Sequence, residues 1–346
     1  MHIRLPAARL IAVVAVLVGV VAVGAAYAST QMSGKVTKIA IATPAKDNDY
    51  GWNQQGVKAA RAAAKASGAS IQVVTNIGYD KTDVVLRQLA SSGAKFVIAH
   101  ASGYDTVAAR LAKQLKVPMI TYDNPKLLGK GYLSNITTSS EQASYLAGML
   151  AARTTKAHKV GILVSANDPN WFKMSGGFAA GFRSIDKKSK IYLAIVSPTG
   201  YDDSAGGKRV AASVIARGAD VLFCMGDGAT FGYLQAIETA KASHKVWMIG
   251  DIGNLAPIDK KHVFLSSVLW SFTGAFKSAI RDINKGTFGT HGYNLSLANG
   301  GVSLLKTHYI KAGLWKQIQK ARAKIVAKKI KVPVATTKAA VQRLIK

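Results

Sequence analysis

The segment 46–55 brings together carboxylates, amides and two aromatic residues, the side chains that recognise a small polar ligand. It reads Lys-Asp-Asn-Asp-Tyr-Gly-Trp-Asn-Gln-Gln. Carboxylates accept hydrogen bonds from hydroxyl and ring N–H groups, and aromatic faces stack on a flat heterocycle or on the apolar face of a sugar. A short apolar strand is predicted over 36–43 and an Ala-rich helix over 56–67, ended by Gly68. The segment is therefore predicted to lie at the carboxyl end of a strand, where ligands bind in open α/β sheets.

Short strands rich in aliphatic residues alternate with helical segments along nearly the whole chain. Strands are predicted at 38–43, 71–75, 96–100, 119–122, 159–164, 191–196, 221–224 and 246–250. Helices are predicted at 80–91, 104–115, 139–154, 172–185, 204–217 and 231–242. Strands separated by helices of this length form parallel sheets, so the predicted fold class is α/β.

Two pairs of similar segments indicate an internal repeat. Residues 93–98 and 218–223 each follow a helix and open a strand. Residues 117–123 and 245–251 each form a strand that ends in a carboxylate. The repeat predicts two Rossmann-like lobes, with a ligand-binding cleft between their carboxyl-end edges.

The chain is long enough for two domains and carries a large positive charge. It has 346 residues, of which 46 are Lys or Arg and 17 are Asp or Glu, for a net charge of +29. Nucleic-acid binding would explain such a charge. The basic residues are spread along the chain, however, and the densest stretch, 316–331, has the spacing of a solvated helix face, so no nucleic-acid partner is expected. Adaptation to an acidic exterior and attraction to an anionic membrane surface are the remaining interpretations.

The N-terminus has the pattern of an export signal. Arg4 and Arg9 precede an apolar run over 10–25, and Ala-Tyr-Ala at 26–28 fits the small-x-small rule of signal peptidase. We predict a cleaved signal peptide over 1–28 and a location in the periplasm or at the extracytoplasmic membrane surface. An uncleaved anchor is the alternative, because the run approaches the roughly 20 residues that span a bilayer.

No local motif provides a catalytic or metal-binding centre. The loop 226–232 has its third glycine misplaced by one residue for a dinucleotide loop, and 47–58 lacks the glycine and glutamate of a calcium loop. The seven histidines have no metal-ligand spacing, and there is no Gly-x-Ser-x-Gly elbow. We therefore expect no cofactor, no metal and no enzyme activity. Because catalytic groups can converge from distant loops, a nucleoside-processing hydrolase is kept as an alternative.

Eight short motifs follow one another in a characteristic order. The first is Asn-Asp-Tyr-Gly-Trp-Asn-Gln at 48–54, and the later ones lie at 144–148, 159–162, 177–182, 218–221, 246–250, 300–302 and 330–333. In this order they resemble the motifs of the basic membrane protein family, the purine-nucleoside-type substrate-binding proteins of ABC importers. The resemblance extends over 36–333.

The resemblance implies a type I periplasmic-binding fold, in which two lobes joined by three crossovers close on a ligand. The lobes are expected at 36–124 plus 252–288 and at 125–251 plus 289–333, followed by a basic tail over 334–346. It also implies an extracytoplasmic solute-binding protein, expected as a monomer, that delivers a nucleoside-like small molecule to an ABC transporter permease in the membrane.

The resemblance assigns ligand-binding residues as well. The family holds the base between two aromatic residues, for which Trp52 matches the first and Tyr201 is the candidate for the second. Its polar contacts fall on four residues, Asp49, Asn53, Asp123 and Asp251. The alternatives are that Trp52 caps a helix, that Tyr201 lies in a solvated loop, and that the carboxylates at strand ends cap the next turn.

Trp270 is a departure from the family pattern. Family members similar to nucleoside receptors carry a ligand-contacting lysine where this chain has tryptophan. Trp270 is predicted to line the cleft, with packing in the hinge region as the alternative. The predicted ligand is thus a nucleoside or similar heterocyclic metabolite, and a sugar or another ring-bearing ligand is the alternative.

Overall fold

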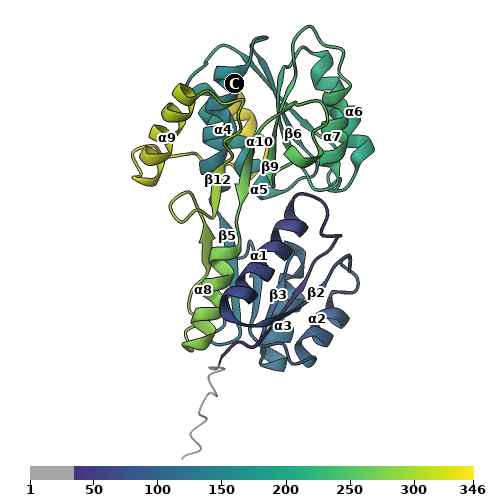
Figure 1. Ribbon diagram of the computed structural model, residues 1–346, viewed down its shortest axis with the longest axis vertical. Coiled ribbons are helices and arrows are strands. Elements are labelled where there is room, and N and C mark those ends of the chain that lie inside the picture. Colours follow the sequence, from purple (N-terminus) through teal and green to yellow (C-terminus); the bar gives the residue numbers. More distant parts are fainter. Residues whose placement is uncertain (1–34) are drawn as a thin grey trace, which may run out of the picture. The chain divides into compact units, whose positions relative to one another are not determined.

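Two six-stranded sheets, each flanked by helices, form the part of the chain that the computed structural model describes, residues 35–346 (Figure 1). The predicted signal over 1–28 lies outside the described residues. The strands of the first sheet are β1 (Lys38–Ala42), β2 (Ser70–Val74), β3 (Phe96–Ala99), β4 (Met119–Tyr122), β5 (Leu133–Thr138) and β11 (Tyr293–Leu295). All of them are parallel, in the order β11-β5-β4-β3-β1-β2. We call this sheet and its helices the first lobe.

The second lobe contains the second sheet. Its strands are β6 (Lys159–Val164), β7 (Lys190–Ile195), β8 (Val221–Met225), β9 (Trp247–Ile252), β10 (Phe264–Trp270) and β12 (Val302–Leu304). Their order is β12-β10-β9-β8-β6-β7, and only the pairing of β10 with β12 is antiparallel. The central strands β3, β4 and β8 are buried along their whole length, as expected for parallel strands covered on both faces. The predicted α/β class is confirmed.

Helices follow the strands in both lobes. Those of the first lobe are α1 (Trp52–Ser67), α2 (Thr82–Ser91), η1 (Ser102–Tyr104), α3 (Asp105–Leu115) and α8 (Thr273–Asn284). Those of the second lobe are α4 (Ser140–Thr154), α5 (Pro169–Arg183), α6 (Ser204–Ala216), α7 (Ala229–Glu238), η2 (Ala256–Ile258), α9 (Ala312–Val326) and α10 (Lys338–Ile345). The chain passes between the lobes after β5, after β10 and after β11, which gives the three crossovers of a type I periplasmic-binding fold.

The sheet pairing corrects the predicted lobe boundaries. The first lobe was expected to end at 124 and to resume over 252–288. Instead β5 and β11 belong to the first sheet, and β10 pairs with β9 in the second. The boundaries were misplaced because strand membership depends on which distant strand supplies the backbone hydrogen bonds, and short polar strands such as β5 and β11 carry little periodic signal.

The predicted basic tail over 334–346 is also corrected. It contains α10, which packs on α5 (Figure 1). Val341 is completely buried and forms a small apolar cluster with Ala335 and Phe172. The Arg183 guanidinium donates a hydrogen bond to the carbonyl of Ile345. The apolar positions between the basic residues therefore anchor this segment on the second lobe.

Glycines set the close contact between α4 and α5. A Cβ at Gly148 would lie 2.0 Å from the carbonyl oxygen of Phe178, and one at Gly181 would lie 1.9 Å from that of Tyr145. Real Cβ atoms do not approach so closely, so the two helix backbones can touch only where these side chains are absent. This contact explains why glycine ends the motif at 144–148 and recurs within the motif at 177–182.

Candidate binding site

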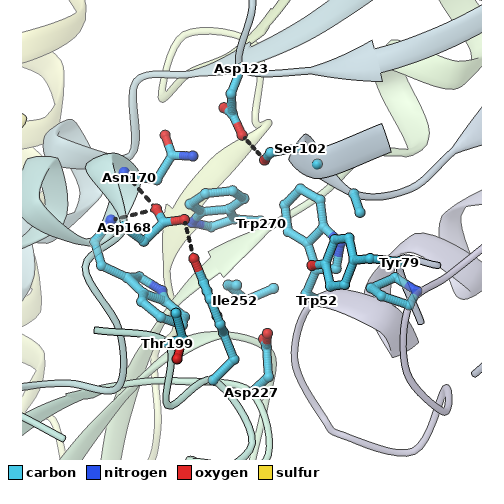
Figure 2. Close-up of a pocket in the computed structure, with 15 residues that line it drawn as sticks. Trp52, Tyr79, Ser102, Asp123, Asp168, Asn170, Thr199, Asp227, Ile252 and Trp270 are labelled. Atoms are coloured by element: carbon cyan, nitrogen blue, oxygen red, sulfur yellow. Dashed lines mark hydrogen bonds between the residues drawn. The ribbon is translucent and has the colours of Figure 1, made fainter. Parts of the chain in front are cut away.

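A cavity of about 510 Å³ lies among the carboxyl ends of the strands and is lined by residues of both lobes (Figure 2). The first lobe contributes Pro44 after β1, Trp52, Tyr79 after β2, Ser102 after β3 and Asp123 after β4. The second lobe contributes Asp168 and Trp171 after β6, Thr199 and Tyr201 after β7, and Asp227 after β8. Ile252 and Trp270 end β9 and β10. The cavity has the size of a site for a small metabolite and lies at the sheet edges where the sequence predicted a cleft.

Trp52, the first residue of α1, forms one wall of the cavity. Its indole stacks on the imidazole of His100, with ring centroids 4.5 Å apart and planes 19° from parallel. The indole Nε1 donates a hydrogen bond to the carbonyl oxygen of His100 at 2.9 Å. Phe272 contacts the indole edge-on, with centroids 5.2 Å apart. Trp52 is therefore fixed in one orientation before any ligand arrives.

His100 supports this wall as a neutral imidazole. Its Nε2 lies 2.9 Å from the carbonyl oxygen of Trp52, which can only accept, so Nε2 carries the proton. Nδ1 then accepts from the hydroxyl of Tyr122 at 2.6 Å. Burial lowers the pKa of His100 to about 3, because the charged form would lose its hydration. A Cβ at Gly56 would lie 2.1 Å from Nε2, so the ring fits against α1 only beside a glycine.

Asp49 and Asn53 do not line the cavity but build the start of α1. The Asp49 carboxylate accepts hydrogen bonds from the backbone N–H groups of Gly51, Asn53 and Gln54 at 2.9 to 3.0 Å. It also accepts one from the side-chain amide of Asn53 at 2.8 Å. Only 7% of Asp49 and 1% of Asn53 is exposed. In place of the predicted ligand contacts, these two residues stabilise the first turn of α1 and so position Trp52.

Tyr201 and Trp171 form a wall on the second lobe. Both line the cavity, and their ring centroids are 5.2 Å apart with planes tilted by 40°. The hydroxyl of Tyr201 donates to Asp168 at 3.4 Å, and Asp168 also caps α5 by accepting from the backbone N–H of Asn170 and of Trp171. Tyr201 thus lines the cavity, and its stacking on a ligand stays a prediction.

Asp251 lies behind this wall and does not line the cavity. Its Oδ2 accepts a hydrogen bond from the Trp171 Nε1 at 2.9 Å, and it is 4% exposed. Burial raises the pKa of Asp251 to about 8. The ligand contact predicted for Asp251 is therefore replaced by the orientation of Trp171.

Trp171 was not predicted from the sequence as a cavity residue, although the spacing of the residues before it provides a signal. Asp168-Pro169-Asn170-Trp171 repeats the spacing of Asp49-Tyr50-Gly51-Trp52, and each aspartate caps the helix that carries its tryptophan. Proline at the first helical position reinforces this start. The internal repeat thus places an equivalent tryptophan at the cavity from each lobe.

Trp270 lines the cavity at the point where β10 leads into the crossover to α8. It is 4% exposed, and its ring lies 6.0 Å from that of Trp52 in an edge-to-face arrangement. In Figure 2 it lies between Trp52 on one side and Asp168 on the other. Trp270 therefore packs near a crossover and also lines the cavity, and its contact with a ligand stays a prediction.

Three carboxylates face the cavity. Asp123 accepts a hydrogen bond from the hydroxyl of Ser102 at 2.5 Å (Figure 2). Burial and the nearby charge of Asp123 raise the pKa of Asp168. Burial and several neighbouring carboxylates raise the pKa of Asp227 well above its usual value. The site is thus rich in hydrogen-bond acceptors.

Three residues near the cavity hold a left-handed backbone without being glycine. The φ angles are 56° at Tyr50, 61° at Asp123 and 58° at Ile252. Such a conformation is uncommon for any side chain and a clear outlier for a β-branched residue such as Ile252. Strain of this kind collects at ligand-binding sites, where the surrounding fold enforces it.

The two lobes, their three crossovers and the cavity between the strand ends define a periplasmic-binding type of protein. Residues 36–336 match the model of the family described as ABC transporter substrate-binding protein PnrA-like. This match covers most of the chain, and the protein belongs to that family. The resemblance seen in the sequence motifs is thereby confirmed.

Individual relatives agree with this assignment. The chain is 26% identical over 260 residues to the ABC transporter nucleoside-binding protein BmpA of Lactococcus lactis subsp. cremoris, covering 70% of this chain and 73% of that protein. The fold of this chain is similar to that of a solute-binding protein of an ABC transporter system from Conexibacter woesei, with a TM-score of 0.72 and 21% identity, over 86% of this chain and 99% of that protein. A solute-binding protein from Aeropyrum pernix gives a TM-score of 0.75 at 15% identity, with coverage of 89% and 96%.

Membership of this family defines the general role of the protein. It is a substrate-binding protein of an ABC transporter: it binds a small-molecule ligand and works with transporter components. The family consists of binding proteins and not of enzymes. Proteins of this class are extracytoplasmic or membrane-anchored. Within residues 35–346, no helix combines the length and the apolar character needed to cross a membrane.

Proposed function

We propose that the protein binds a nucleoside or a similar heterocyclic metabolite in this cavity and delivers it to the permease of an ABC importer. The observation that carries the proposal is a pair of aromatic walls, one from each lobe, on a single cavity: Trp52 on the first lobe and the pair Trp171 and Tyr201 on the second. A flat ring bound between them is stacked on both faces once the lobes close about their three crossovers.

The polar groups of the cavity suit the sugar of a nucleoside. The Asp123 and Asp168 carboxylates accept hydrogen bonds from hydroxyl groups, and Asn170 adds a side-chain amide. In a cavity shielded from water, a ligand that lacks the matching donors leaves these groups unpaired, which is the physical basis of selectivity. The relative from Lactococcus lactis, named as a nucleoside-binding protein, supports the same ligand class. We propose further that the protein acts as a monomer after removal of residues 1–28.

Thermal unfolding of the exported form, from Ser29 onward, tests the proposal with a panel of nucleosides, free bases, flavins and sugars. A ligand at a hundredfold excess over its Kd stabilises the folded state by about 2.7 kcal/mol, which raises the melting temperature by several degrees. Stabilisation by nucleosides is expected. Stabilisation by sugars alone would overturn the nucleoside assignment, and release of free base from a bound nucleoside would favour the hydrolase alternative.

A further inference from the structure

The cavity is lined by acidic residues, although the chain as a whole is strongly basic. Asp123, Asp168 and Asp227 line it, and no lysine, arginine or histidine among residues 35–346 does. Three further carboxylates, Asp49, Asp202 and Asp251, lie close enough to raise the pKa of Asp227 through their charge. Six of the 17 acidic residues in a chain of net charge +29 are therefore concentrated at one site.

Asp227 is the least compensated of these carboxylates. Its Oδ1 is shielded from solvent and has no hydrogen-bond partner among the described residues. The ion pairs formed within residues 35–346 use other aspartates, Asp83, Asp186, Asp203 and Asp282. Removing an ionised carboxylate from water costs several kcal/mol unless a cation or several donors replace the water. The ligand-free cavity provides neither for Asp227.

The aromatic lining supplies a second attraction for positive charge. Trp52, Tyr79, Trp171, Tyr201 and Trp270 all line the cavity, which is one third of its 15 lining residues. The face of an aromatic ring is electronegative and attracts cations, and aromatic cages are the usual sites for ammonium groups and other cationic ligands. Acidic and aromatic side chains around one cavity thus favour the same kind of ligand.

We propose that the ligand carries a positive charge on or beside its ring, with Asp227 as the principal counter-charge and the aromatic walls enclosing the charged ring. The inference rests on the proposed function, because it uses the same cavity and narrows the ligand class to cationic heterocycles and their nucleosides. A bare metal ion does not explain the acidic lining, since no cluster of three metal-ligating side chains occurs among residues 35–346. Charge repulsion disfavours an anionic ligand such as a nucleotide in this cavity.

Matched ligands that differ mainly in charge test the proposal by calorimetric titration of ligand-free protein. Nicotinamide riboside is a permanent cation, 1,4-dihydronicotinamide riboside is its uncharged counterpart, and nicotinamide mononucleotide adds a phosphate. The cation is expected to bind at least tenfold more tightly than the uncharged form, and the phosphorylated compound is expected to bind more weakly than the cation. Equal or tighter binding of the uncharged form would overturn the inference while leaving the proposed function intact.

A second pair of ligands separates failure of the inference from failure of the proposed function. If sugars stabilise the protein and nucleosides do not, the proposed function fails, and glucosamine is then compared with glucose. Tighter binding of glucosamine would retain the cationic ligand in a sugar-binding site. If neither nicotinamide riboside nor glucosamine binds, the inference is wrong.

A substitution assigns the effect to one carboxylate. Asp227→Asn keeps the size of the side chain and removes its charge, so it should reduce the preference for the cation over the uncharged form at least tenfold. Asp80→Asn is the control, because Asp80 is exposed and does not line the cavity. It removes the same charge and should leave the preference unchanged. An unchanged preference in a folded Asp227→Asn protein, or an equal loss in both variants, would overturn the role of Asp227.

Discussion

Replacement of Trp52 by alanine is the most direct test of the proposed stacking. Stacking between an aromatic side chain and a nucleobase contributes about 1 to 3 kcal/mol, which corresponds to a change in Kd of roughly 5-fold to 150-fold. Trp52 is already fixed by stacking on His100, with ring centroids 4.5 Å apart, and by its Nε1 hydrogen bond. Ligand binding therefore loses little free energy to the ordering of this side chain. We therefore expect Trp52→Ala to weaken binding at least tenfold, measured by calorimetric titration with the ligand found in the thermal screen.

The control must separate loss of stacking from loss of stability. Trp52→Ala also leaves the carbonyl of His100 without its donor and opens a gap in the core, at a cost of up to about 3 to 5 kcal/mol. Trp247→Ala is a matched variant: Trp247 is half-buried, packs on Tyr309 with centroids 5.0 Å apart, and does not line the cavity. It should lower stability while its Kd stays within about twofold of wild type. The reasoning is refuted if a folded Trp52→Ala protein keeps the wild-type affinity, or if Trp247→Ala weakens binding as much.

Three further predictions concern stability. Gly181→Ala places a Cβ 1.9 Å from the Tyr145 carbonyl and should lower the free energy of unfolding in urea by about 1 to 3 kcal/mol or more, whereas Gly313→Ala, at an exposed position of α9 with open space around it, should raise it by up to about 1 kcal/mol. Similar effects at both sites would contradict the close contact between α4 and α5. The pKa of His100 in the folded state, about 3, lies below the usual 6.5, so the contribution of the neutral ring to stability is present above pH 6.5 and is lost as pH falls toward 3. The loss of unfolding free energy caused by His100→Gln should therefore shrink by up to about 1.4 kcal/mol per pH unit between pH 6 and 4. A loss that stays constant with pH would disprove a buried neutral ring. The raised pKa of Asp227 has the opposite effect on stability, because ionisation of this carboxylate above its usual pKa destabilises the folded state. Asp227→Asn should therefore raise the melting temperature of ligand-free protein at pH 7, and this increase should disappear near pH 4. A lower melting temperature at pH 7 would show that the carboxylate is compensated in the folded state.

The order of strands and helices was predictable because it depends on residues close together in the sequence. The periodicity of apolar residues predicted β1, β3, β4 and β6 to within one residue at either end. The four strands that were missed, β5, β10, β11 and β12, are short, polar or far from any repeat, and they exist because a neighbouring strand supplies their hydrogen bonds. Local periodicity carries no information about such a partner.

The helix start at Asp49 shows the same limit within the site. The sequence alone predicted a polar turn over 46–55 that contains Trp52, followed by a helix from 56. In the structure α1 begins at Trp52, four residues earlier, because the Asp49 carboxylate accepts from backbone donors two to five residues further along the chain. The sequence did not show that the Asp49 carboxylate is fully used by those donors. In the tertiary structure Trp52 is the residue of this turn that lines the cavity.

Asp123 and Asp251 illustrate what only the tertiary structure decided. Both end strands in equivalent segments of the repeat, and the sequence treats them alike. In the fold, Asp123 faces the cavity, whereas Asp251 is covered by Trp171, a residue 80 positions away in the chain. Spacing and capping are determined by neighbours along the chain, and the sequence by itself therefore determined that there are two lobes with a binding edge, whereas strand pairing decided where each lobe begins and ends. The charge and aromatic lining of the cavity depend on side chains brought together from distant strand ends, and only packing decided which of them reach it.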